Sequence, residues 1–174
     1  PMIEFGNSSH VGLRRELNED TYYSDAELGL WLVADGMGGH EFGEVASALA
    51  RDAVVREVRA GRSLSEAIRS ADEDIIRQSK RRDDSLPMGT TVVALQVTDH
   101  HFELAWVGDS RAYLWNGQLR QISSDHSYVQ ELVSTGHITE YEARSHPRRN
   151  IVTRALGIEP HVRVDTWVLP FVQG

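Results

Sequence analysis

Residues 30–46 read LWLVADGMGGHEFGEVA, and the pattern of this stretch changes in its middle. Its first five residues are apolar and stop at Asp35-Gly36, which predicts a short buried strand. Beyond the glycines the apolar residues are spaced three and four apart, which predicts an amphipathic helix that runs to Arg59. A carboxylate therefore stands where a buried strand gives way to a glycine-rich turn and a helix. The apolar stripe of this helix consists of Phe42, Val45, Ala46, Leu49 and Ala53.

The segments on either side predict an α+β chain rather than strands and helices that alternate in a parallel sheet. The stretch from Ser63 to Glu66 is typical of a capping box that opens a second helix, and Thr139 to Glu142 is another. Between 123 and 149 the pattern is one of short helices and loops. Asn116-Gly117 is a hairpin signal between two strands. The strand candidates are 2–7, 21–24, 30–34, 90–97, 102–107, 110–115, 118–122 and 162–169.

The composition excludes several classes of protein. The chain has 174 residues, of which 40% are hydrophobic and 25% are charged, and this fits one globular domain. It contains no cysteine, which excludes disulfide scaffolds, zinc–thiolate sites and enzymes with a cysteine nucleophile. A net charge of -8 argues against a nucleic-acid partner, and no apolar run is long enough to span a membrane. Because the first residues show no signal-peptide pattern, we expect a cytoplasmic protein.

Three segments carry acidic residues in patterns that suggest chemistry. Asp35-Gly36 combines a carboxylate with a carbonyl that glycine leaves accessible, a pair of hard oxygen ligands suited to Mg²⁺ or Mn²⁺. Asp109 likewise follows a glycine at the end of an apolar strand, and the segment 12–20 brings arginines close to acids. Each pattern has a plainer interpretation: a glycine-rich turn before a helix, an acid in a hairpin, and a solvated turn.

Other enzyme motifs do not match around these segments. A dinucleotide-binding loop would need glycine in place of Glu41, and a zinc-protease helix would need histidine in place of Glu44. The eight histidines show no metal-ligand spacing, and we expect them to lie at the surface.

Taken together and in this order, five segments resemble the metal-dependent protein phosphatase family of the PPM or PP2C type, in its bacterial branch. The resemblance covers essentially the whole chain and implies a sandwich of two antiparallel β-sheets flanked by helices. It also implies a single domain over 1–174 that is incomplete at its C-terminus, with a flap subdomain at about 123–157 beside the active site. The five segments are 12–20, 33–46, 88–91, 107–113 and 125–156.

The same resemblance implies a site for two Mn²⁺ or Mg²⁺ ions, with a third ion in bacterial members. Asp35 would bridge two ions, and the Gly36 carbonyl would bind one of them. Asp20 would act through metal-bound water, Arg15 would hold the substrate phosphate, and Asp109 would help to bind the third ion. The implied reaction is hydrolysis of phosphoserine and phosphothreonine on proteins by a metal-activated water. The implied protein is a monomer without membrane partners that opposes a bacterial Ser/Thr kinase and acts on that kinase and its targets.

Two departures from the family bear on catalysis. Animal members carry histidine after the metal-binding Asp-Gly as a candidate general acid, but Met37 occupies that position here. Family members also continue beyond the position of Gly174 with two aspartates that complete the metal site. We therefore expect the chain by itself to bind metal weakly and to hydrolyse phosphoesters poorly. The alternative is a non-catalytic phosphatase-like binding module that keeps the phosphate-facing surface without the metals.

Overall fold

The structure is a computed structural model that describes residues 20–81 and 87–170. Helices and antiparallel strands both occur in these residues, and this confirms the α+β class. Arg15 and the strand expected at 2–7 lie outside the described residues.

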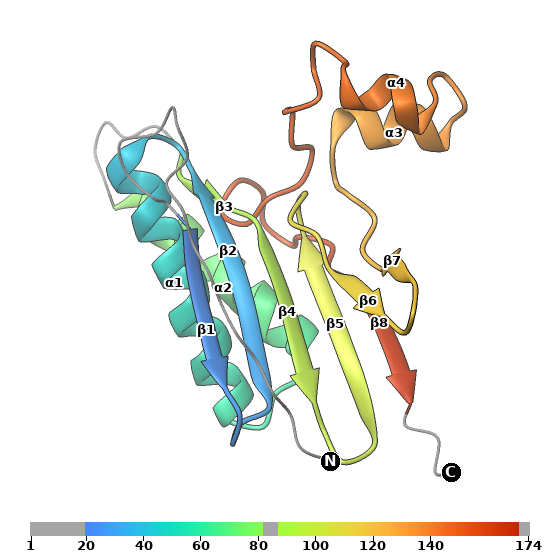
Figure 1. Ribbon diagram of the computed structural model, residues 1–174. Coiled ribbons are helices and arrows are strands. Elements are labelled where there is room, and N and C mark those ends of the chain that lie inside the picture. The colour runs from blue at the N-terminus through green and yellow to red at the C-terminus, as the bar shows by residue number, and fades with distance from the viewer. Residues whose placement is uncertain (1–19, 82–86, 171–174) are drawn as a thin grey trace.

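Six strands form one antiparallel sheet in the order β1-β2-β4-β5-β8, with the short β3 paired to β2 (Figure 1). β6 and β7 form a separate two-stranded sheet around Asn116-Gly117, as the hairpin signal predicted. The predicted strand 90–97 is divided at Thr91, and the last strand begins later than predicted. The strands are β1 (Asp20–Asp25), β2 (Leu30–Met37), β3 (Gly89–Thr90), β4 (Val92–Val97), β5 (His101–Val107), β6 (Tyr113–Trp115), β7 (Leu119–Gln121) and β8 (Asp165–Pro170).

Two long helices, α1 (His40–Arg59) and α2 (Leu64–Lys80), cover one face of the sheet (Figure 1). Ser63 caps α2, since its side chain accepts a hydrogen bond from the amide of Glu66 at 3.2 Å. Both helices begin close to the positions that the sequence predicted, and α1 ends at Arg59 as expected. No helix among the described residues is long and apolar enough to cross a membrane.

Two short helices, α3 (Tyr128–Ser134) and α4 (Glu140–Arg144), lie beyond the end of the sheet (Figure 1). The capping box predicted at the start of α4 is present: Thr139 Oγ1 accepts from the Glu142 amide, and Glu142 accepts from the Thr139 amide. The sequence therefore predicted the start of this helix correctly.

The hydrophobic core lies between the sheet and the two long helices. In β2, Leu30, Leu32 and Ala34 are buried, whereas Val33 on the opposite face is 45% exposed. This alternation is the period of two expected for a strand with one covered face. The apolar stripe of α2 is fully buried and consists of Leu64, Ala67, Ile68, Ala71 and Ile75.

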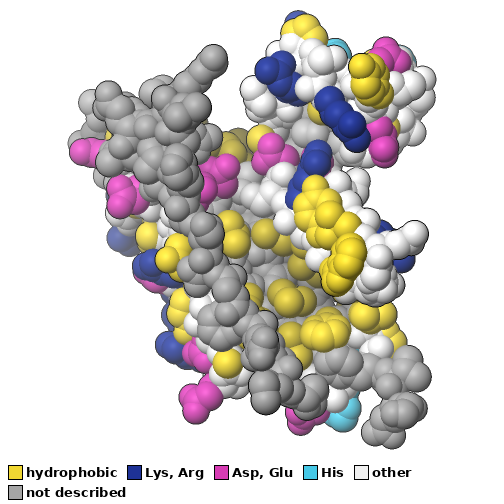
Figure 2. All heavy atoms as spheres, in the orientation of Figure 1, with side chains coloured by type: hydrophobic (Ala, Val, Ile, Leu, Met, Phe, Trp, Pro, Cys, Tyr) yellow, Lys and Arg dark blue, Asp and Glu magenta, His cyan; other side chains and the backbone are white. Residues whose placement is uncertain are grey.

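The opposite face of the sheet also carries apolar side chains. Trp31, Val33, Leu95 and Leu104 line a shallow groove there, together with Tyr113 from the hairpin. Figure 2 shows apolar side chains gathered over this face of the sheet. The apolar run 30–34 in β2 is thus explained by two apolar faces of the sheet, of which α1 and α2 cover one.

Asp72 is a buried carboxyl group in α2. Its side chain accepts a hydrogen bond from the Gly157 amide at 2.7 Å, which ties the loop before β8 to the helix. Burial raises the pKa of Asp72, and the hydrogen bond from Gly157 acts in the opposite direction. The folded state therefore binds a proton on this group more tightly than the unfolded chain does.

We expect the stability of the wild type relative to Asp72→Asn to depend on pH. Because the pKa of Asp72 is higher in the folded state, the wild type should gain stability relative to the variant as pH falls through that raised pKa. The gain should level off below the unfolded value of 3.8. Urea unfolding of both proteins from neutral pH down to about pH 4 measures this difference. A stability difference that does not change with pH, or that shrinks as pH falls, would contradict the raised pKa of Asp72 in the folded state.

Candidate active site

The strand order brings the acidic residues singled out in the sequence to one edge of the sheet. Asp20 begins β1 and is the cross-strand partner of Asp35 near the end of β2. β4 runs antiparallel to both β2 and β5, so the end of β2 and the end of β5 lie at the same edge. Asp109 follows two residues after β5 ends at Val107. Three carboxylates that are distant in sequence therefore lie at a common edge, here called the acidic edge (Asp20, Asp35 and Asp109).

Thr91 connects the end of β2 with the turn after β5 at this edge. Its amide donates to the Asp35 carbonyl at 2.9 Å, and its Oγ1 accepts from the Asp35 amide at 3.3 Å. The same Oγ1 lies 2.8 Å from the hydroxyl of Ser110, so a hydrogen bond joins it to the residue after Asp109. Thr91 is buried and lies between β3 and β4, where its hydrogen bonds divide the predicted strand in two. The end of β2 that carries Asp35 and the turn that carries Asp109 are thus held in a fixed relation.

Gly36 allows the start of α1 to approach the end of β2 closely. A Cβ atom at Gly36 would lie 1.9 Å from the carbonyl oxygen of Gly43 in α1. Backbone atoms occupy the space that any side chain would need. Glycine at this position is therefore required by packing as well as by the accessible carbonyl that the sequence suggested.

The carboxyl group of Asp109 lies in a partly buried and charged setting. Burial raises the pKa of Asp109, and the negative charge of Asp125 adds to the increase, whereas Arg111 opposes it. Arg111 is paired with Asp125 in a two-pronged ion pair, with Nε 3.0 Å from both carboxylate oxygens and Nη2 2.7 Å from Oδ2. A cation beside Asp109 would offset the cost of ionising it there.

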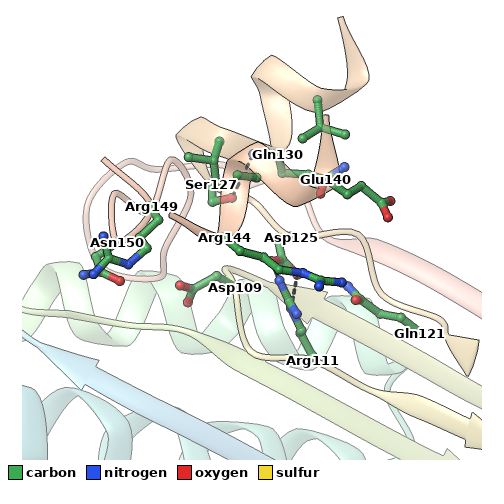
Figure 3. A pocket seen from close by; sticks show the side chains of 13 residues that line it. Asp109, Arg111, Gln121, Asp125, Ser127, Gln130, Glu140, Arg144, Arg149 and Asn150 are labelled. Atoms are coloured by element: carbon green, nitrogen blue, oxygen red, sulfur yellow. Dashed lines mark hydrogen bonds and ion pairs between the residues drawn. The ribbon is translucent and has the colours of Figure 1, made fainter. Parts of the chain in front are cut away.

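A cavity of about 430 Å³ separates the Asp109 turn from helices α3 and α4 (Figure 3). Asp109 and the Arg111–Asp125 pair form one wall, and residues of α3, α4 and the following loop form the other. The sequence had singled out Asp109 here, and the family resemblance implied a flap at about 123–157, but the individual residues of the opposite wall were not named. Arginines and an asparagine in a polar segment give no local signal that they face a distant turn. The polar side chains of the cavity are Asp109, Arg111, Gln121, Asp125, Ser127, Gln130, Glu140, Arg144, Arg149 and Asn150.

One histidine does not lie where the sequence led us to expect it. His126 is 7% exposed and stacks on Trp106, with ring centroids 6.4 Å apart. The expectation that all histidines lie at the surface is therefore wrong for this residue. Packing against residues of β5 and β8 buries it, and that long-range contact leaves no mark in the polar sequence around His126.

The oxygen ligands at the acidic edge fit a hard divalent cation. Asp20, Asp35 and Asp109 supply carboxylates, and Gly36 supplies a carbonyl, which are the ligand types that Mg²⁺ and Mn²⁺ prefer. Within residues 20–81 and 87–170, no group of three or more histidine or acidic side chains is placed to hold an ion. The described residues thus bring oxygen atoms of a suitable type to this edge, but they do not group three such side chains around one point. Arg15, expected at the substrate phosphate, lies outside them.

The sequence and the fold match those of a known class of enzyme. A family model described as protein phosphatase 2C matches residues 9–159, and the chain therefore belongs to the protein phosphatase 2C family. Among its relatives, the serine/threonine phosphatase stp of Listeria monocytogenes serotype 4b is 42% identical over 151 residues. That match covers 80% of this chain and 60% of the Listeria protein, so the chain spans about three fifths of that relative's length.

Solved structures agree with this assignment. The crystal structure of the Mycobacterium tuberculosis serine/threonine phosphatase PstP matches with a TM-score of 0.85 and 38% identity, over 94% of this chain and 71% of that one. The catalytic domain of PstP in complex with two manganese ions matches with a TM-score of 0.78 and 36% identity, over 92% and 70% of the two chains. The resemblance that the sequence motifs suggested, including its bacterial branch, is confirmed.

Proposed function

We propose that this protein hydrolyses phosphoserine and phosphothreonine on proteins, with divalent cations bound at the acidic edge. The observation that carries the proposal is the cross-strand pair of Asp20 and Asp35, with Asp109 at the same end of the sheet. Membership of the protein phosphatase 2C family supports it. A manganese complex of a relative supports Mn²⁺ as one suitable cation, and Mg²⁺ shares its preference for oxygen ligands.

Within this proposal the residues have separate roles. Asp35 and the Gly36 carbonyl would hold a pair of cations, Asp20 would act on them through bound water, and Asp109 would help to hold a third. When bound, such cations supply an activated water and offset negative charge on the phosphoryl group. Arg15 would bind the substrate phosphate through its guanidinium group. Met37 has no proton to donate, so these residues provide no side-chain general acid next to Asp35-Gly36.

The segment with α3 and α4 would serve as the flap beside the site, within about 123–157. Its residues form one wall of the cavity whose other wall includes Asp109 (Figure 3). A peptide that presents a phosphorylated side chain to the acidic edge would pass this cavity. The partners would be phosphorylated proteins, among them a bacterial Ser/Thr kinase and its targets. A monomer in the cytoplasm remains our expectation.

Two forms of the protein test the proposal: the chain itself, and a fusion that continues it with the C-terminal segment of the Listeria relative. Phosphate release from a phosphothreonine peptide and from an aryl phosphate is measured with Mn²⁺ and with a chelator. The chain should release phosphate slowly, and the fusion at least roughly tenfold faster, a difference of about 1.4 kcal/mol in the barrier. Both rates should vanish with the chelator. Absence of Mn²⁺-dependent release from both forms would contradict the proposal.

The second candidate is a non-catalytic module that binds phosphoproteins. One observation favours it: among the described residues, no three acidic or histidine side chains are grouped to hold a metal. Such a module would bind a phosphothreonine peptide with equal affinity in Mn²⁺ and in chelator. It would also leave the phosphate on the peptide in both forms of the protein. Fluorescence anisotropy of a labelled peptide, read beside the release assay, separates the two candidates.

A further inference from the structure

His126 lies at the junction of three segments that are distant in the sequence. Its amide donates to the Gly108 carbonyl at 2.9 Å, and its own carbonyl accepts from the Thr153 amide at 2.9 Å. Its ring reaches the Gly108 amide on one side and Asp165 of β8 on the other. His126 therefore contacts the turn before Asp109, the chain that returns from α4, and the last strand.

The hydrogen bonds of the ring define its protonation. The Gly108 amide donates to Nδ1 at 2.9 Å, so Nδ1 must carry a lone pair. Nε2 lies 2.8 Å from Asp165 Oδ2 and 3.0 Å from Nη1 of Arg154. The two hydrogens of Nη1 are taken up by Asp165 Oδ1 and the Arg163 carbonyl, and a carboxylate can only accept, so Nε2 must carry the proton that is shared with Asp165 Oδ2. The ring is thus neutral with its hydrogen on Nε2. Burial also lowers the pKa of His126, which agrees with a neutral ring.

Asp165 is in turn held by a second donor. Nη1 of Arg154 donates to Asp165 Oδ1 at 3.1 Å and to the Arg163 carbonyl at 3.0 Å. Although burial alone would raise the pKa of Asp165, the hydrogen bonds from His126 and Arg154 bring it below its usual value. Asp165 is therefore a carboxylate that fixes the orientation of the His126 ring, in the way that an outer carboxylate orients the histidine of many enzyme sites.

Gly108 adopts a backbone conformation that favours glycine, directly before Asp109 at the acidic edge. Gly108 has φ of 114°, and a Cβ atom there would lie 2.6 Å from the side chain of Thr91. The peptide that follows carries Asp109. Two hydrogen bonds hold Gly108 in this conformation: the His126 amide donates to the Gly108 carbonyl, and the His126 ring accepts from the Gly108 amide.

We propose that His126 is a positioning residue for the metal site: its unprotonated Nδ1 holds the Gly108 amide and so sets the direction in which Asp109 presents its carboxylate. The proposal rests on the proposed function in one respect, namely that Asp109 is a cation ligand. A buried histidine with a merely structural role would fill the same space. In that case the conformation of Gly108 and the affinity for a cation would not depend on which ring nitrogen accepts a hydrogen bond.

Two substitutions of His126 separate these alternatives. The oxygen of asparagine occupies about the position of Nδ1, so His126→Asn keeps an acceptor for the Gly108 amide. The amide of glutamine lies near the position of Nε2, so His126→Gln keeps a partner for Asp165 and removes that acceptor. His137→Gln is the control, because His137 is exposed on the loop after α3 and does not contact Gly108.

Hydrogen exchange of the Gly108 amide, followed by NMR in the metal-free chain, is the first measurement. His126→Gln should exchange this amide roughly tenfold faster than the wild type, as expected for one lost hydrogen bond. His126→Asn and the control should stay close to the wild type. In the wild type, a scalar coupling across the hydrogen bond between the Gly108 nitrogen and His126 Nδ1 should be visible without any substitution. Absence of this coupling, or equal exchange in the Asn and Gln variants, would overturn the proposal.

Mn²⁺ titration of the same variants, made in the fusion with the Listeria segment, is the second measurement. His126→Asn should bind Mn²⁺ more tightly than His126→Gln, by up to roughly tenfold, as for other outer residues that orient metal ligands. Equal affinities would overturn the role in positioning Asp109 for a cation. If the wild type binds no Mn²⁺, the proposed function fails and the metal role of His126 fails with it. The exchange measurement would still decide whether His126 clamps Gly108.

Discussion

Replacing Asp35 with asparagine is expected to lower Mn²⁺-dependent release of phosphate from a phosphothreonine peptide by roughly a thousandfold. Asp35 is the ligand that the proposed function assigns to both cations of the central pair. Metal ions stabilise the transition state of phosphoryl transfer by several kcal/mol, and a loss of about 4 kcal/mol corresponds to this factor. The measurement is the initial rate of the fusion with the Listeria segment, with and without the substitution, at saturating Mn²⁺.

The control for this prediction is Asp99→Asn. Asp99 is exposed in the turn between β4 and β5, at the end of the sheet opposite Asp35, and the substitution removes the same charge. It should leave the rate within about twofold of the wild type, as is usual for an exposed surface position. Similar rates for the Asp35 and Asp99 variants would show that the acidic edge is not where phosphate is released.

Replacing Gly36 with alanine is expected to give the largest loss of stability. The new Cβ atom would lie 1.9 Å from the Gly43 carbonyl oxygen and 2.3 Å from its carbonyl carbon, so helix α1 must move away from β2. Overpacking against backbone should cost about 3 kcal/mol or more. For a domain of this size, that cost lowers the melting temperature by roughly 6 to 12 °C. Thermal unfolding followed by circular dichroism measures the change.

Gly61→Ala is the matched control for this substitution. Gly61 has φ of 85°, but no atom lies within 4 Å of the position of a Cβ atom there. Only backbone strain remains, and it should cost about 1 kcal/mol. If Gly36→Ala were no more harmful than Gly61→Ala, the close approach of β2 and α1 would not exist in solution.

Local patterns were enough to predict most of the elements. The helix stripe from Phe42 and the cap at Ser63 depend on neighbours a few residues away, and both are present in the structure. The hairpin at Asn116-Gly117 is likewise local, because a two-residue turn needs only the right residues in sequence. The order of the acid-bearing segments then pointed to the family, and the family predicted the antiparallel fold.

The parts that the sequence could not predict depend on contacts between distant segments. Thr91 interrupts a predicted strand because it bonds to Asp35 at the end of β2 and to Ser110 in the turn after β5, and no neighbour of Thr91 signals this. His126 stands among polar residues, yet Trp106 and Asp165 bury it. The family resemblance implied a flap at about 123–157 beside the site, but the residues of α3 and α4 that face Asp109 could not be named. Hydrophobic periodicity reports which face of a helix is apolar and not what its polar face opposes.

Calorimetric titration of the fusion with Mn²⁺ tests the central claim most directly, because it measures cation binding without a substrate. The claim is that Asp35 and its neighbours at the acidic edge bind the cations that the reaction uses. Loss of even an outer residue beside a metal ligand typically costs roughly 10- to 100-fold in affinity. We therefore predict that Asp35→Asn weakens Mn²⁺ binding by at least that factor while Asp99→Asn leaves it unchanged. A binding curve for Asp35→Asn that overlays the wild type would contradict the claim.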